Sequence, residues 1–174
     1  MRMKFKLEEA IPLLRKTPLL MKVLLKDLPK TWTQDNYTDL WSPFDIIGHL
    51  IHGERTDWLP RTRIILSNVS DKTFEPFDRF AQFENSKGET MDDLLLEFES
   101  LRKKNMEELL SFSLSKEQLM QEGKHPEFGK VTLEELLSSW VVHDMAHIAQ
   151  MVKVMASRYR EEVGPWASYM NILK

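Results

Sequence analysis

Residues 132–150 read TLEELLSSWVVHDMAHIAQ, and this stretch has the pattern of a long amphipathic helix. Thr132, followed three positions later by Glu135, is a capping-box signature for a helix start. Apolar residues then recur three and four positions apart, at Leu133, Leu136, Leu137, Trp140, Met151, Val154 and Met155. The periodicity predicts a helix from Thr132 to about Tyr159.

Two histidines, His143 and His147, lie one turn apart on this predicted helix. Side chains at i and i+4 project from the same side of a helix, so both imidazoles can bind one metal ion. The alternative is a pair of hydrogen-bonded histidines, because a bare H-x-x-x-H lacks the glutamate of the zinc-protease motif. Asp144 lies within the apolar stripe and needs a partner if it is buried, such as a tryptophan indole or a loop amide. It could equally be a solvated acid on the helix surface.

Outward from this stretch, the same periodicity predicts long helices over residues 7–28, 43–66 and 91–112. Pro18 predicts a kink or break in the first of them, and Pro60 predicts a kink in the second. A short helix is expected from Ser115, and another over residues 166–173. Residues 30–42 read as a loop, residues 123–130 as a turn or short hairpin, and no segment alternates convincingly enough for a sheet. Four long apolar helices predict an all-α four-helix bundle, with residues 1–174 forming one domain.

The longest connection, residues 67–89, combines turn residues with four phenylalanines: Phe74, Phe77, Phe80 and Phe83. A segment this apolar is expected to pack on the bundle rather than to remain in water. Long ordered loops are often functional. We therefore expect residues 68–89 to cover the mouth of a pocket.

Composition excludes several classes of protein. The chain has no cysteine, which rules out disulfides, cysteine-ligated metals and a cysteine nucleophile. The formal net charge is −3 and no basic block stands out, so nucleic-acid binding is not expected. No run of 18 apolar residues is present, and the charged N-terminus lacks the apolar core of a signal peptide. A cytoplasmic protein without membrane association is therefore expected.

The second predicted helix carries a third histidine and a carboxylate. Glu54 projects toward its apolar centre, whereas His49 and His52 lie on the flanks. Periodicity alone does not favour His49 as a metal ligand. Gly48 and Gly53 lie on either side of His49, however, and glycine lets another backbone or a ligand approach closely.

Two segments together resemble the signatures of the DinB-like superfamily: WSPFDIIGHLIHGER at residues 41–55 and GKVTLEELL at residues 129–137. The second is followed at the expected spacing by Trp140, His143, Asp144, His147 and Gln150. The match in order and spacing covers nearly the whole chain. The resemblance implies an up-down four-helix bundle, often dimeric, in which His49, His143 and His147 hold a divalent metal.

The implied ligand set indicates which metals and which kind of site to expect. Three neutral imidazoles suit zinc or nickel, with iron also possible. Three protein ligands leave a coordination position open, as in catalytic rather than structural sites. Characterised members of the superfamily include thiol transferases that use low-molecular-weight thiols. The resemblance therefore implies a metal-dependent enzyme, a thiol S-transferase or a hydrolase, acting on a small electrophilic molecule.

Roles for other side chains remain open at this stage. Glu54 or His52 could accept a proton if either faces the metal. Arg55, Arg61 and Arg63 could hold a carboxylate of the thiol or substrate, or could be ordinary surface charges. Two alternatives remain for the whole protein: a non-catalytic module that binds a metal or small ligand, and a structural bundle without a metal.

A homodimer is the expected assembly. The first and third predicted helices have wider apolar stripes than one bundle core needs, and surplus contiguous apolar surface usually marks an interface. The alternative is a monomer in which the phenylalanine-rich segment and the C-terminal residues 166–173 cover that surface.

Overall fold

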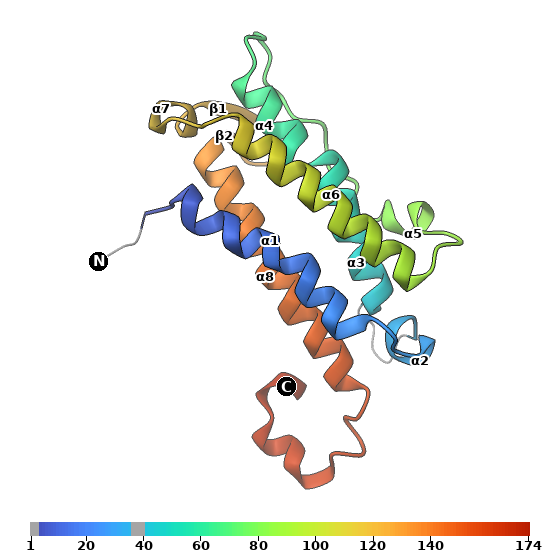
Figure 1. Ribbon diagram of the computed structural model, residues 1–174. Coiled ribbons are helices and arrows are strands. Elements are labelled where there is room, and N and C mark those ends of the chain that lie inside the picture. Colours follow the sequence, from blue (N-terminus) through green and yellow to red (C-terminus); the bar gives the residue numbers. More distant parts are fainter. Residues whose placement is uncertain (1–3, 36–40) are drawn as a thin grey trace.

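The computed structural model describes residues 4–35 and 41–174, whose long helices form a four-helix bundle (Figure 1). Its helices are α1 (Leu7–Leu25), α3 (Pro43–Thr56) continued by α4 (Trp58–Leu66), α6 (Met91–Ser111) and α8 (Leu133–Ser157). The shorter elements are α2 (Lys30–Thr33), α5 (Gln82–Asn85), α7 (Lys116–Leu119), β1 (Glu122–His125), β2 (Gly129–Thr132), η1 (Gly164–Tyr169) and η2 (Asn171–Leu173).

The expected all-α fold and four-helix bundle are confirmed. The structure also adds elements that the pattern left open. The predicted turn or hairpin at residues 123–130 is a two-stranded antiparallel hairpin, β1–β2. The predicted loop at residues 30–42 contains α2, while residues 36–40 of that loop lie outside the described residues.

The order of packing fixes which helices meet. α1 packs on α6 and α8, and α3 packs on the same two helices, so α1 and α3 occupy opposite corners (Figure 1). One core cluster joins the start of α1 and of α8 to α4 and the end of α6. The other joins the end of α1 and of α8 to the starts of α3 and α6. Successive long helices therefore alternate in direction except α4 and α6, which are parallel because residues 67–90 run back along the bundle.

Three of the long helices begin with a capping box. Ser42, Thr90 and Thr132 each accept a hydrogen bond from the backbone three positions on, and the acid there bonds back to the cap. Such reciprocal caps satisfy backbone donors that no helical partner can reach.

Pro18 does not break α1, because another helix replaces the bond that the proline removes. A proline at position 18 leaves the carbonyl of Leu14 without its usual N–H partner. Nη1 of Arg102 in α6 donates to that carbonyl at 2.6 Å. α1 therefore continues through Pro18 to Leu25.

The kink that Pro60 predicts in this helix lies at Asp57, three residues before the proline. Asp57 has φ −106° and ψ −77° and separates α3 from α4. Breaking the helix there places Pro60 in the first turn of α4, where its missing N–H costs nothing. The structure therefore confirms the kink that Pro60 predicted and locates it at Asp57.

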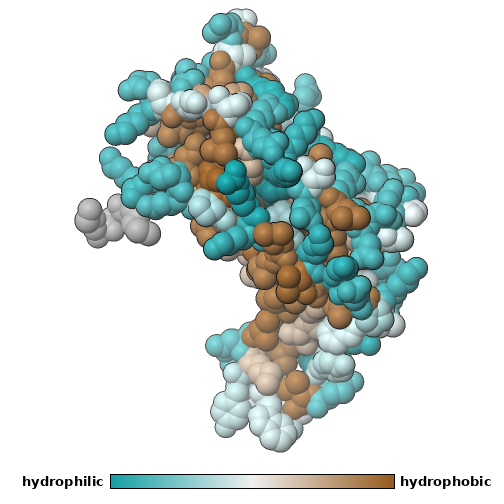
Figure 2. All heavy atoms as spheres, viewed as in Figure 1, coloured by the Kyte–Doolittle hydropathy of each residue, from teal (hydrophilic) through white to brown (hydrophobic). Residues whose placement is uncertain are grey.

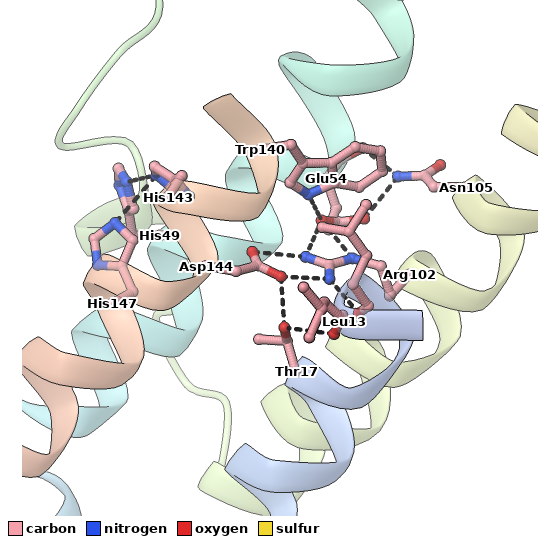
Figure 3. Close-up of polar contacts among 11 residues, drawn as sticks. Leu13, Thr17, His49, Glu54, Arg102, Asn105, Trp140, His143, Asp144 and His147 are labelled. Carbon is pink, nitrogen blue, oxygen red and sulfur yellow. Dashed lines mark hydrogen bonds and ion pairs between the residues drawn. The ribbon is translucent and has the colours of Figure 1, made fainter. Parts of the chain in front are cut away.

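A network of buried polar side chains lies between the two core clusters (Figure 3). Arg102 is 2% exposed and forms ion pairs with Glu54 of α3 at 2.8 Å and Asp144 of α8 at 2.6 Å. Thr17 of α1 also donates to Asp144, and Asn105 of α6 donates to Glu54. All four sides of the bundle thus meet in one hydrogen-bonded network.

This network decides between the two interpretations of Asp144, a buried and partnered carboxylate or a solvated surface acid. Its carboxylate is buried, so the surface alternative is wrong. Its partners are Arg102 and Thr17, rather than the tryptophan indole or loop amide that we expected. The indole of Trp140 donates instead to Glu54 at 3.2 Å.

The C-terminal segment packs against the end of α8. It forms two 3₁₀ helices, where the sequence predicted one short helix, and Leu173 is its buried contact. Among the described helices, none is both long enough and apolar enough to cross a membrane.

Candidate metal centre

Three histidines converge on one point at the side of α8 (Figure 3). Nε2 of His143 lies 3.3 Å from Nε2 of His49 and 3.1 Å from Nε2 of His147. His49 comes from α3, and the other two come from successive turns of α8. The structure therefore brings together all three residues that the resemblance implied, including His49, which periodicity did not favour.

The spacing of these nitrogens fits a shared cation. Two nitrogens bound to a tetrahedral zinc at its usual bond lengths lie about 3.3 Å apart. Without a cation, the single Nε2 proton that His143 can carry would serve only one of its two close contacts. The donor set and its geometry therefore fit a divalent metal.

The three imidazoles are held in the neutral form that a metal requires. Burial lowers the pKa of His49 to about 4, with smaller contributions from His147, His52 and Arg79. Burial also lowers the pKa of His143 to about 3, and it lowers the pKa of His147. Each ring is therefore uncharged near neutral pH, with a lone pair available to bind.

Outer contacts orient two of the rings. Nδ1 of His147 donates to Oε1 of Gln150 at 2.8 Å, which leaves Nε2 free to bind a metal. Trp41 lies against His49, with ring centroids 4.9 Å apart. The Nδ1 atoms of His49 and His143 are buried and have no hydrogen-bond partner within the described ranges.

The histidines line a cavity of about 780 Å³. Part of its wall comes from Pro76, Phe77 and Arg79, which belong to the segment predicted to cover the pocket. Another part comes from the tip of the β1–β2 hairpin, residues 125–128. The backbone N–H of Phe74 bonds to Lys124 of the hairpin at 2.9 Å. Gly123 makes this contact possible, since a Cβ there would lie 2.4 Å from the ring of Phe74.

The phenylalanines of residues 67–89 divide between core and cavity. Phe74 is buried in the first core cluster, and Phe77 lines the cavity between His49 and His52. Phe80 and Phe83 are more exposed and pack edge-on against Trp41.

Neither proposed proton acceptor belongs to the described cavity wall. Glu54 points into the bundle core, where it is bound by Arg102, on the far side of α8 from the histidines (Figure 3). The ring of His52 packs on Phe77, and its Nε2 lies 3.4 Å from Oγ1 of Thr56, outside the lining. The structure therefore does not support Glu54 or His52 as a proton acceptor at the metal.

Of the three candidate arginines, only Arg61 lies in the cavity wall. Arg55 and Arg63 form ion pairs on the surface with Glu97 and Glu108. Arg61 instead lines the cavity, as do two charged residues that the sequence did not single out, Asp57 and Arg79. The kink at Asp57 places Asp57 and Arg61 in the wall. Arg61 was already a candidate from the sequence, whereas no sequence pattern indicated Asp57.

Asp57 is the buried carboxylate of this cavity. Its side chain does not cap α4 but contacts Nε of Arg61 at 2.7 Å. Burial raises its pKa to about 6, an effect that the positive charge of Arg61 opposes. A carboxyl group with a pKa this close to neutrality can both accept and return a proton.

Comparison with known proteins identifies the family and confirms the fold. The family model described as the DinB superfamily matches residues 13–151. The chain belongs to the DinB superfamily. Among solved structures, YfiT from Bacillus subtilis matches with a TM-score of 0.74 and 20% sequence identity, over 91% of each chain. At that identity the likeness shows the fold of this DinB-superfamily chain. YfiT is described as "a probable metal-dependent hydrolase with an unusual four-helix bundle topology". No curated protein matches the chain significantly.

Proposed function

We propose that the protein is a metal-dependent enzyme in which His49, His143 and His147 hold a divalent cation. Zinc or nickel suits three neutral imidazoles. The observation that carries the proposal is the convergence of three Nε2 atoms on the wall of one cavity. A bound cation would lower the pKa of water or of a low-molecular-weight thiol and so supply a nucleophile at neutral pH. The description of YfiT as a probable metal-dependent hydrolase supports the same class of chemistry.

The residues around the cavity have three different roles in this proposal. The histidines hold the cation from one side and leave the cavity side for the nucleophile. Asp57 takes the place of Glu54 and His52 as the candidate proton acceptor, because it is the carboxylate buried in the cavity wall. Trp41 and Phe77 flank His49 and limit the access of bulk water to it.

Hydrolysis and thiol transfer are tested side by side. Protein reconstituted with zinc or nickel is assayed with p-nitrophenyl acetate for hydrolysis, and with monochlorobimane plus cysteine or glutathione for thiol transfer. We expect turnover in one assay, lost on chelation and restored by metal. Metal binding and saturation by ligands without turnover in either assay would instead favour the non-catalytic binding module.

Replacing Asp57 by asparagine should reduce kcat by at least about 100-fold, the lower end of general acid–base effects. Asp57 must be ionised to accept a proton, and its pKa is raised to about 6. The wild-type rate should therefore fall as the pH drops through about 6, and the variant should lose this limb of the profile. Glu127→Gln, at an exposed position of the same wall, is the control and should keep the limb. A wild-type rate and profile for Asp57→Asn would remove Asp57 from the mechanism.

We also propose that the protein forms a homodimer, through a face on α1 and α8 rather than on α1 and α6. Hydrophobic residues gather over α1 and α8 (Figure 2), where Leu13, Leu20, Val142 and Met145 are all more than 40% exposed. An isologous contact would cover this face about a two-fold axis.

Light scattering at low micromolar concentration tests the dimer. We expect a mass twice 20.6 kDa, and Val142→Lys should shift the protein toward the monomer because it places a charge in the face. Val69→Lys, at an exposed residue beyond α4, is the matched control and should not change the mass. A wild-type mass of 20.6 kDa would reject the dimer.

A further inference from the structure

Arg61 has hydrogen-bonding capacity that the fold does not use. Its side chain is buried in the cavity wall, and its guanidinium lies over the ring of Phe74 at 5.1 Å. Nε contacts Asp57 at 2.7 Å, and Nη2 donates to the carbonyl of Glu75 at 3.3 Å. A guanidinium has five N–H donors in a fixed plane. Nη1 donates to none of the described residues, so its hydrogens remain for a ligand in the cavity.

His125, at the tip of the hairpin, offers a second donor beside Arg61. Its Nδ1 accepts from the backbone N–H groups of Glu127 and Phe128, at 3.2 and 3.3 Å. Burial, followed by the nearby charge of Arg61, lowers its pKa, so the ring is neutral and carries its proton on Nε2. Stacking on Phe128, with centroids 4.4 Å apart, holds the ring in place. The hairpin therefore presents an oriented N–H group.

Arg79 adds a positive charge to the same cavity. It is exposed, lines the cavity, and forms no ion pair within the part of the chain that the structure describes. Its charge reaches the histidines, since it contributes to the lowered pKa of His49. The carboxylates of the lining are Asp57, which is already paired with Arg61, and the exposed Glu127. Among the described lining residues, Glu127 is therefore the one carboxylate without an ion pair in the cavity, and the N–H groups of Arg61 Nη1, Arg79 and His125 remain for a ligand.

We propose that Arg61, Arg79 and His125 form an anion subsite that binds the carboxylate of a small substrate. A planar guanidinium edge with one further N–H suits a carboxylate. Asp57 and Glu127 in the same wall disfavour a dianion such as a phosphate monoester. Phe77 and Phe128 line the cavity and favour an apolar body on the ligand. The subsite names a substrate class, small apolar carboxylates, and for its part in catalysis it rests on the proposed function.

Benzoate and its neutral analogue benzamide test the subsite on metal-free protein, prepared with a chelator that is then removed. Isothermal titration should show benzoate binding at least about tenfold more tightly than benzamide, as expected for hydrogen bonds to a charged group. Arg61→Met and Arg79→Met should each weaken benzoate binding by about tenfold or more. Asp57→Asn should tighten it, because it removes the charge that opposes the ligand while keeping the side-chain shape.

Two controls separate the subsite from other causes. Arg63→Met removes an arginine of α4 that is paired with Glu108 on the surface, and it should leave benzoate binding unchanged. His147→Ala should also keep benzoate binding, because the subsite does not use the metal ligands. Arg61→Met leaves Asp57 without its partner. If this variant fails to fold, benzoate binding is measured on Arg79→Met, at an exposed residue, and on the double variant Asp57→Asn with Arg61→Met.

Equal affinities for benzoate and benzamide would overturn the subsite. Benzoate binding that survives both Arg79→Met and the double variant would also overturn it. So would benzoate binding that requires added metal and disappears in His147→Ala, because the anion would then bind to the cation rather than to the arginines. Because these measurements use metal-free protein, they are independent of turnover. Selective benzoate binding in a protein that catalyses neither reaction would support the subsite and reject the proposed enzyme.

Discussion

Replacing Arg102 by methionine is expected to lower the free energy of unfolding by about 3–5 kcal/mol, the usual cost of removing one partner from a buried ion pair. Methionine keeps much of the side-chain volume but leaves Glu54 and Asp144, both almost fully buried, without a counter-charge. It also strips the Leu14 carbonyl, freed by Pro18, of its donor. Since globular domains are stable by only about 5–15 kcal/mol, the loss is a large fraction of the whole.

Urea denaturation of the two proteins under the same conditions measures the change. Arg63→Met, which breaks an exposed pair with Glu108, is the matched control and should cost no more than about 1 kcal/mol. Burial already raises the pKa of Glu54 in the intact network. In Arg102→Met, the unpaired Glu54 should therefore take up a proton on acidification, and the loss of stability relative to the wild type should shrink as the pH falls. A loss below about 1 kcal/mol at neutral pH would show that the network is not a stabilising centre.

Replacing His147 by alanine is expected to lower the affinity for zinc or nickel by more than about 100-fold. Loss of an outer contact to a metal ligand typically costs 10–100-fold, and loss of the ligand itself should exceed that range. Gln150→Ala, which removes the partner of Nδ1 of His147, should fall within about 10–100-fold. The order of the two effects follows from direct and indirect contact with the cation.

Metal content is measured on protein expressed without an affinity tag, by elemental analysis and by competition with a chelator. His52→Ala is the control, because His52 lies in α3 near His49 but outside the cavity lining. It should retain one metal ion per chain. Full stoichiometry and unchanged affinity in His147→Ala would place the metal elsewhere or show that the histidines serve another purpose.

Local pattern was sufficient for the helices and for part of the site. Helix starts at Ser42, Thr90 and Thr132 follow from capping residues whose hydrogen bonds span only three positions. The pairing of His143 with His147 follows from the rise and turn of a single helix. In each case the interacting groups lie within one or two turns of the chain, so the sequence carries the information directly.

Long-range contacts decided the rest. Periodicity placed His49 on the flank of its helix, and only the packing of α3 against α8 brings its Nε2 to 3.3 Å from that of His143. Glu54 looked like a proton acceptor because a carboxylate on an apolar face suggests chemistry. Its partner, Arg102, lies 48 positions away and turns it into a structural residue.

By itself, then, the sequence determined the long helices, their caps and the histidine pair of α8, because those features depend on neighbours along one chain segment. The resemblance that it carries pointed to the third histidine. Only the tertiary structure decided that the helix breaks at Asp57, that Asp57 and Arg61 enter the cavity wall, and that Arg102 joins the four sides of the bundle. The physical reason is that a buried charge must find its partner in space. The position of that partner depends on how the helices pack, which no local period encodes.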